Sequence, residues 1–370
     1  MSTSKKPLRW VRATLAAAVT ALTLTVAPAA HADTPGQPPL PDGFGLTKVA
    51  TDPAIVAANT PTNFVITVTT PQVAGTHHIR IMLPADYYTN TTKHYPVLYF
   101  LHGTGDDPAN ASLAWPALRD ASARSSMITV EPDGGLRGWY ANWLNQNTAA
   151  GAQNWETFHL GQVIPFIDAD LRTIPDKAHR AIAGLSMGGF GAMHYAEDRP
   201  DLFSQVASLS GAIDLGRDSM DVRMAAVGTL TNGAGVLCGS STNPSCPGGF
   251  GPTVDSDALF GTPYPFSIFY PFSDVLWNAA DPSTHLSKLT GMGISLYVGN
   301  GNGNPADEEF WAESATTHVK TNLDALGMPS HYVDYGNGAG WGTCAGHHDA
   351  PCWAADMVDF VPRLEAAFGA

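Results

Sequence analysis

A short glycine-rich motif constrains the fold of this 370-residue chain more than any other feature. Gly184, Ser186 and Gly188 form a G-x-S-x-G pattern, which follows the apolar run 182–185 and precedes a segment rich in alanine, glycine and methionine. This context is typical of a strand–turn–helix elbow, in which the serine hydroxyl is exposed at the end of a sheet. The competing interpretation is a glycine-rich turn capped by the serine. We predict that Ser186 is a nucleophile for acyl transfer.

The first 32 residues have the pattern of a secretory signal peptide. Four basic residues precede an apolar run over 15–27, and a small-residue cleavage site, Ala-His-Ala, ends at residue 32. The apolar run is too short for a membrane span, and no later run reaches about 18 apolar residues. We expect residues 1–32 to be removed on export, which makes the mature protein secreted, without stable membrane insertion. A retained anchor is the alternative.

Removal of this segment leaves an acidic protein. The 19 basic residues fall to 15 while all 33 acidic residues remain, so the net charge becomes −18 with neutral histidines. No basic cluster is left, which argues against nucleic acid or an anionic membrane surface as a partner. We expect residues 33–50, which begin with a proline-rich stretch, to form a flexible leader. Residues 51–370 are long enough for one large core, and we expect a single monomeric domain.

Short apolar runs alternate with helical patterns along this domain. Strands are predicted at 64–69, 77–83, 96–101, 127–130, 180–185, 206–209 and 294–298, and helices at 158–171 and 308–326. The alternation predicts the α/β class with a doubly wound, mostly parallel sheet. Residues 211–275 interrupt the rhythm with glycine, proline, serine and aromatic residues. We interpret them as a cap or lid insertion.

Acyl transfer through a serine needs a base, an acid that orients the base, and amides that bind the oxyanion. His347 and His348 lie in a loop before a predicted final helix, and we expect one of them to be the base, although a surface pair or a metal-binding fragment is the alternative. Asp281 is interpreted as a helix N-cap. One member of an acidic group after the strand at 294–298 is expected to orient the histidine; the group is Asp307, Glu308, Glu309 and Glu313.

The four cysteines form two pairs, Cys238/Cys246 and Cys344/Cys352, with seven residues between the members of each pair. An oxidising compartment favours disulfides, for which three connectivities are possible. Local pairing is favoured, because each pair brackets a loop rich in glycine and proline that can turn back on itself. The C-x-x-C spacing typical of zinc sites is absent from the sequence, so we expect no metal, and the chemistry implies no cofactor.

With these motifs in place, the chain resembles the esterase family of α/β-hydrolases that includes the mycobacterial mycolyltransferases (the antigen 85 complex) and esterases of the S-formylglutathione hydrolase type. The similarity extends over about residues 77–365. It rests on Leu-His-Gly-Thr at 101–104, Asn-Trp-Glu-Thr-Phe at 154–158, Gly-Leu-Ser-Met-Gly at 184–188, Trp-Asn-Ala-Ala-Asp-Pro at 277–282, Tyr-Val-Gly-Asn-Gly at 297–301, and a histidine five residues before Trp353. The resemblance implies an α/β-hydrolase fold.

The resemblance also implies a role for individual residues. Ser186 matches the nucleophile, and His348 matches the base because it precedes a tryptophan by five positions. His347 falls where the family has a different residue. The backbone amides of Thr104 and Met187 match the two donors of the oxyanion hole.

The acid is the least constrained match. A fit without gaps selects Glu309, because it places three residues on the family's helix positions, namely Val319, Leu323 and Gly327. An alignment on Phe310 points towards Glu313 instead, and Glu308 is a further alternative.

Three positions depart from the mycolyltransferases. The aspartate and arginine that help those enzymes bind trehalose are replaced by His102 and Gly105, and the tryptophan two residues after the base is Ala350. The resemblance therefore implies a serine esterase that hydrolyses small-molecule, lipid or glycan esters through an acyl-enzyme. One alternative is an acyltransferase that moves the acyl chain to a sugar or another alcohol. Another is a non-catalytic binding or adhesion protein on the same scaffold.

Overall fold

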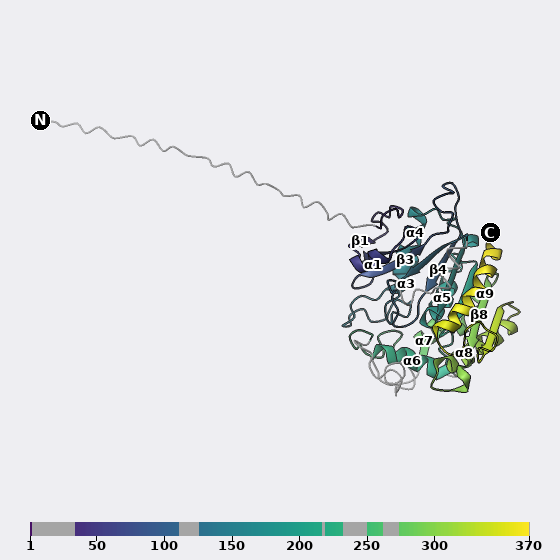
Figure 1. The fold of residues 1–370 in the computed structure, drawn as a ribbon. Helices are drawn as coiled ribbons and strands as arrows, with labels where there is room; N and C mark the ends of the chain where they lie inside the picture. The colour runs from purple at the N-terminus through teal and green to yellow at the C-terminus, as the bar shows by residue number, and fades with distance from the viewer. Residues whose placement is uncertain (2–33, 111–125, 217–218, 232–249, 262–273, 370) are drawn as a thin grey trace. The chain divides into compact units, whose positions relative to one another are not determined.

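The computed structural model describes residues 1, 34–110, 126–216, 219–231, 250–261 and 274–369 (Figure 1). The predicted signal peptide lies outside this part of the chain, apart from Met1, as do Cys238, Cys246 and parts of the predicted lid. Residues 31–370 form one compact unit.

A single nine-stranded sheet runs through the described part of this unit, in the order β1–β2–β3–β5–β4–β6–β7–β8–β9. Its pairs are parallel from β5 to β9 along this order, whereas β1/β2, β2/β3 and β3/β5 are antiparallel. The strands are β1 (Thr47–Val49), β2 (Asn63–Thr69), β3 (His77–Met82), β4 (Val97–Leu101), β5 (Ile128–Pro132), β6 (Arg180–Leu185), β7 (Gln205–Leu209), β8 (Gly293–Gly299) and β9 (His331–Gly336). The predicted α/β class with a mostly parallel sheet is confirmed.

The seven predicted strands correspond to β2–β8, while the two edge strands were not predicted. β1 is only three residues long, and most side chains of β9 are partly exposed, so neither gives the apolar run of a central strand. The expectation of a flexible leader is wrong from Leu40 onward. Leu40 and Leu46 are buried in the core, and β1 pairs with β2, so these residues are held by packing and by the ladder.

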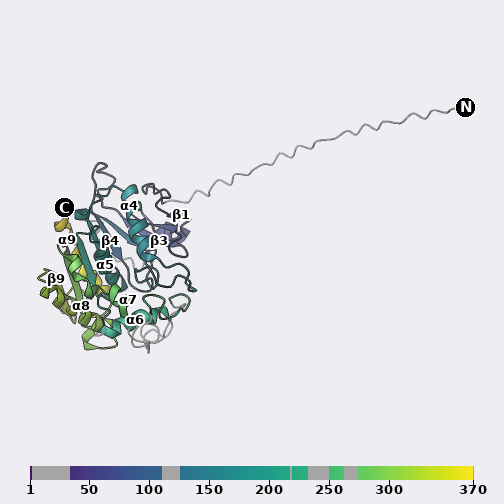
Figure 2. The same ribbon diagram turned by 180° about the vertical axis from the view of Figure 1, so that it is seen from behind.

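Helices cover both faces of the sheet (Figures 1 and 2). Apolar side chains of α4, α5 and α8 pack into the core on one face, and those of α9 pack on the other. This two-sided cover explains why β4 and β6 are buried along their whole length. The helices are α1 (Pro53–Ala58), α3 (Trp155–Phe158), α4 (Ile164–Asp170), α5 (Met187–Asp198), α6 (Met220–Leu230), α7 (Asp274–Ala280), α8 (Glu308–Ala325) and α9 (Ala350–Phe368).

The helix expected over 158–171 contains an irregular turn. A π-helical turn, His159–Val163, joins α3 to α4. Pro165 lies at the start of α4 and has no backbone N–H to donate to the preceding turn, which accounts for the wider turn at this point. The helix expected over 308–326 is α8. None of the helices in the described residues is both long and apolar enough to cross a membrane.

Candidate active site

The turn between β6 and α5 places Ser186 in a strained conformation. Its φ is 53° and its ψ −122°, in a region that residues with a side chain rarely adopt. Gly184 and Gly188 lie so close together that a Cβ on Gly184 would overlap the carbonyl of Gly188, and a Cβ on Gly188 would overlap the carbonyl of Leu101. The motif therefore has glycines where packing leaves no room for a side chain, as an elbow requires.

His348 forms a hydrogen bond with Glu309. The histidine lies in the loop between β9 and α9, and its Nδ1 donates to Glu309 Oε2 at 2.8 Å. The Glu309 side chain, in the first turn of α8, is completely buried, and that of His348 is 13% exposed. Glu309 is therefore the acid that contacts the imidazole through Nδ1, whereas no hydrogen bond or ion pair joins Glu313 to the imidazole in the described structure.

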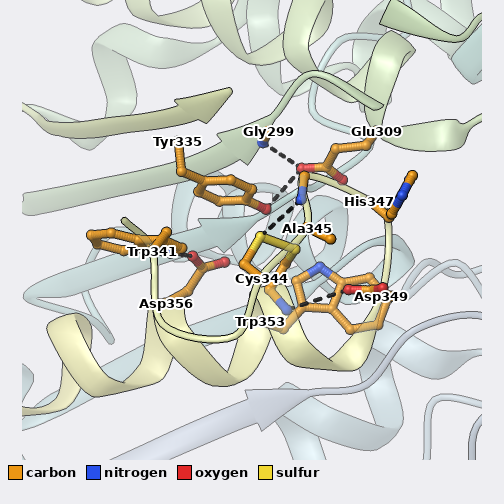
Figure 3. The surroundings of a disulfide bond; sticks show 12 residues. Gly299, Glu309, Tyr335, Trp341, Cys344, Ala345, His347, Asp349, Trp353 and Asp356 are labelled. Carbon is orange, nitrogen blue, oxygen red and sulfur yellow. Dashed lines mark hydrogen bonds between the residues drawn. A yellow bond between two sulfur atoms is a disulfide. The ribbon is translucent and has the colours of Figure 1, made fainter. Parts of the chain in front are cut away.

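Three further donors fix the second oxygen of Glu309. Oε1 accepts hydrogen bonds from the backbone amide of Gly299 at 2.6 Å and the hydroxyl of Tyr335 at 2.9 Å, both drawn in Figure 3. It also accepts one from the hydroxyl of Ser210 at 2.8 Å. A buried carboxylate with its lone pairs satisfied in this way is held in one orientation. Neither Ser210 nor Tyr335 was predicted as part of the site, because no motif in the sequence marks them.

Trp353 supports the imidazole from α9. The two rings meet edge to face, with centroids 4.9 Å apart and planes at 90°. The indole Nε1 of Trp353 donates to Ser210 Oγ at 3.1 Å, so the tryptophan also belongs to the hydrogen-bond network around Glu309. The five-residue spacing between His348 and Trp353 therefore reflects a direct contact.

The surroundings of His348 favour its protonated form. Burial acts to lower the pKa of the imidazole, but the hydrogen bond that His348 donates to Glu309 and the negative charges of Glu308, Glu309 and Asp307 outweigh burial, so the pKa is raised above its usual value. The second ring nitrogen, Nε2, is buried and has no hydrogen-bond partner in the described structure. This nitrogen is free to exchange a proton with another group.

His347 forms a separate pair with Asp307. Its Nδ1 donates to Asp307 Oδ2 at 2.6 Å, and its side chain is 46% exposed. The other oxygen of Asp307 accepts from the backbone amides of Glu309 at 3.0 Å and of His348 at 3.3 Å. Asp307 thus caps the N-terminus of α8 and ties the histidine loop to it.

Ser186 and His348 line the same pocket. Two tryptophans, Trp139 and Trp311, also contribute to it, as do Thr104, Ser210, Gly211, Ala212, Val222, Ala225, Glu308 and Ala312. The wall is mostly apolar, which suits the acyl part of an ester.

Thr104 lines this pocket, and Met187 directly follows Ser186 in the chain. The amides of Thr104 and Met187 donate to no other atom of the described residues. Met187 is the first residue of α5, and the free amides of a helix N-terminus attract negative charge. A Cβ on Gly103 would lie 3.4 Å from the Cβ of Ser186, so the loop that contains Thr104 packs directly against the elbow.

A disulfide links Cys344 to Cys352 across the histidine loop (Figure 3). Cys352 lies in the first turn of α9, and the amide of Gly346 donates to the sulfur of Cys344 at 3.2 Å. The predicted local pairing of these two cysteines is confirmed. Because the bridge encloses His347 and His348, it restricts the segment that carries both histidines.

Two other acidic sites lie outside this pocket. One is Asp281, and the other is a cluster of two acidic residues and one histidine. Asp281 caps the short turn Pro282–Thr284 and accepts from the amide of Ser283, as expected. Among the described residues, one group has side-chain atoms close enough together to suit a metal ion: Glu156, His194 and Asp198. Lys288 Nζ lies 3.4 Å from Asp198, so this group already has a positive charge beside it.

Sequence and structure comparisons relate this chain to known proteins. The sequence model of the Esterase family matches residues 71–364. The chain belongs to the Esterase family. Esterase Rv1288 of Mycobacterium tuberculosis is 39% identical over 177 residues, which cover 48% of this chain but only 37% of that relative. The diacylglycerol acyltransferase/mycolyltransferase Ag85B of Mycobacterium avium is 27% identical over 290 residues, covering 74% of this chain and 76% of the relative.

Two solved structures share the fold of this chain. MPT51 (FbpC1) of Mycobacterium tuberculosis has a TM-score of 0.60 at 18% identity, covering 82% of this chain and 97% of that one. The fluorophosphonate-binding serine hydrolase FphF of Staphylococcus aureus has a TM-score of 0.57 at 15% identity, covering 82% and 98%. The predicted α/β-hydrolase fold is confirmed.

Proposed function

We propose that this member of the Esterase family is a secreted serine esterase that hydrolyses carboxylic esters through an acyl-enzyme on Ser186. The observation that carries the proposal is the buried, unpartnered Nε2 of His348 in the pocket that Ser186 also lines. Glu309 holds the opposite nitrogen, Nδ1, which leaves Nε2 as the basic atom. This is the arrangement that a serine nucleophile needs for activation.

In the proposed reaction, Ser186 Oγ attacks the carbonyl carbon of the ester while its proton passes to His348 Nε2. The amides of Thr104 and Met187 bind the oxyanion of the tetrahedral intermediate. Collapse of this intermediate breaks the bond to the alcohol, which leaves with the proton from Nε2. Water then attacks the acyl-enzyme, gives its proton to Nε2 and releases the acid, and the proton returns to Ser186. Glu309 keeps the imidazole in one tautomer throughout and stabilises its charged form.

Transfer of the acyl group to an alcohol is the second candidate, because Ag85B is named as an acyltransferase and matches three quarters of this chain. Hydrolysis is favoured by His102, which stands where the resemblance places a trehalose-binding aspartate. The His102 side chain is fully buried; its Nδ1 donates to the carbonyl of Gly103 at 2.9 Å and its Nε2 accepts from the amide of Gly134 at 2.8 Å. Both ring nitrogens of His102 therefore form hydrogen bonds within the protein, and neither is available to bind a sugar.

The test is a reaction with p-nitrophenyl butyrate and with a fluorophosphonate probe. A serine esterase releases p-nitrophenol and forms one covalent adduct, on the peptide that contains Ser186, and the Ser186→Ala variant does neither. Addition of glycerol or a disaccharide distinguishes the two candidates, since an acyltransferase diverts the butyryl group to the alcohol. Absence of both labelling and turnover would instead support the non-catalytic binding protein.

Two further features are part of the proposal. The sequence of residues 1–32 supports export and cleavage after residue 32, which mass spectrometry of the secreted protein tests. The segment 211–275 is proposed as a lid, because Val222 and Ala225 of α6 line the pocket. The mature protein is proposed to act as a monomer without a cofactor or metal.

A further inference from the structure

A second carboxylate lies beside the reactive nitrogen of the proposed triad. Glu308 is the first residue of α8 and lines the pocket together with Ser186 and His348. Its Oε2 lies 3.6 Å from His348 Nε2, on the side of the ring opposite to the nitrogen that Glu309 binds. Glu308 therefore faces the reacting atoms, whereas Glu309 lies behind the imidazole.

The carboxylate of Glu308 has unused hydrogen-bonding capacity. Glu309 accepts four hydrogen bonds, but Glu308 accepts none from the described residues, and its side chain is 31% exposed. Burial, together with the charges of Asp307 and Glu309, raises the pKa of Glu308, while the charge of a protonated His348 acts in the opposite direction. A partly desolvated carboxylate of this kind gains from a hydroxyl donor and disfavours a second anion nearby.

The position of Glu308 relative to Nε2 indicates which part of a substrate it meets. During formation of the acyl-enzyme, Nε2–H donates its proton to the leaving oxygen, so that oxygen must lie within hydrogen-bond reach of Nε2. A carboxylate oxygen 3.6 Å from the same nitrogen then lies next to the leaving alcohol. The atoms nearest to it are substituents on the carbon adjacent to the one that bears the ester oxygen.

We propose that Glu308 is a specificity-determining residue, which accepts a hydrogen bond from a hydroxyl group next to the ester oxygen of the leaving alcohol and rejects leaving alcohols that carry a carboxylate there. The preferred substrates are thus monoesters of 1,2-diols, with the acyl chain in the apolar part of the pocket. This inference rests on the proposed serine esterase function.

The experiment compares three butyrate esters that share one acyl group. They are the esters of propan-1-ol, of propane-1,2-diol at its primary hydroxyl, and of glycolic acid. Their kcat/KM values report acyl-enzyme formation, the stage at which the leaving alcohol is still bound. Ratios between esters are measured within each variant, so a general loss of activity or of folded protein cancels.

The wild-type enzyme is expected to favour the diol ester over the propyl ester by about 10-fold or more, as for one hydrogen bond to a charged group. Glu308→Leu brings this ratio close to one. Glu308→Gln keeps part of the preference for the diol ester, because the amide oxygen still accepts a hydrogen bond. The substitution also removes the negative charge. We expect the glycolate ester to gain about 10-fold relative to the propyl ester in this variant.

Glu313→Leu is the matched control. Glu313 lies on the same helix but does not line the pocket, so its replacement should leave both ratios at their wild-type values. A wild-type ratio near one, or an unchanged ratio in Glu308→Leu, overturns the role of Glu308 while turnover of the propyl ester still supports the esterase. A wild-type enzyme that hydrolyses none of the three esters and takes up no fluorophosphonate overturns both proposals.

Discussion

His347 Nδ1 donates a hydrogen bond of 2.6 Å to Asp307 Oδ2, beside the bond that the next histidine makes to Glu309. Two successive histidines of one loop thus bind two acids at the start of one helix. The outer pair, His347 and Asp307, is partly exposed and does not line the pocket, whereas His348 of the inner pair with Glu309 lines the pocket together with Ser186. The outer pair holds the loop, and the inner pair is proposed to carry the chemistry.

We predict that replacing these neighbours has very different consequences. His348→Ala should lower kcat by a factor of at least about 10³, because no other base faces the pocket from this loop. His347→Ala should cost no more than several-fold, because Asp307 still accepts from the amide of His348. Steady-state kinetics with p-nitrophenyl butyrate measure both values. The reverse ranking would show that the base has been assigned to the wrong histidine.

Glu309→Gln is predicted to lower kcat by a factor of about 10³–10⁴ with little change in KM, because the imidazole loses its orienting charge. The substitution preserves the shape of a side chain that is completely buried and accepts four hydrogen bonds. Glu313→Gln serves as the control and should retain wild-type kcat. Similar, mild losses at Glu308, Glu309 and Glu313 would contradict the proposed acid.

The nucleophile is tested by Ser186→Ala. Ester hydrolysis and fluorophosphonate labelling should fall to background, while circular dichroism and the thermal midpoint stay close to the wild type, because the hydroxyl is not part of the core packing. Retention of more than a few per cent of the activity by the folded variant would refute the assignment of Ser186.

The pH profile follows from the charge of His348. The base must be neutral, so kcat/KM falls as the pH drops through the pKa of the imidazole. Because that pKa is raised above 6.5, the midpoint of the acid limb should lie above pH 6.5. Glu308→Gln removes one of the negative charges that stabilise the imidazolium, and the midpoint should move to lower pH. A midpoint that is unaffected by this substitution would show that Glu308 is too well screened to influence His348.

The disulfide is predicted to matter more for turnover than for folding. The double variant Cys344→Ser/Cys352→Ser should lose about 10- to 100-fold in kcat, because a small displacement of the base is costly. Its thermal midpoint should fall less severely than its activity. The companion variant Cys238→Ser/Cys246→Ser should keep most of its kcat. Full turnover in the first variant, or free thiols at 344 and 352 by mass mapping, would exclude a catalytic contribution from this bridge.

The sequence predicted the central strands because burial on both faces leaves an uninterrupted apolar run, as in β4 and β6. It did not predict β9, since an edge strand with partly exposed side chains has no such signal. The pairing of His348 with Glu309 was expected only from the alignment with the family. Four acidic residues lie within a stretch of seven positions, and the residue type alone does not show which of them binds the histidine.

The network behind Glu309 could not be predicted in the same way. Ser210 and Tyr335 lie 99 and 26 residues from Glu309 along the chain, and they meet it only because β7, β8 and β9 are neighbours in the sheet. Single serines and tyrosines carry no periodic signal, so such contacts depend on the order of the strands rather than on a local pattern.

The backbone of Ser186 has a consequence for attempts to engineer this protein. A residue with a side chain held at φ 53° costs on the order of 1–3 kcal/mol, a sizeable fraction of the net stability of a typical fold. Glycine at the same position would relieve that strain and retain the turn. Directed evolution that selects only for heat resistance would therefore favour loss of the nucleophile, and libraries of this chain require a screen for turnover at every round.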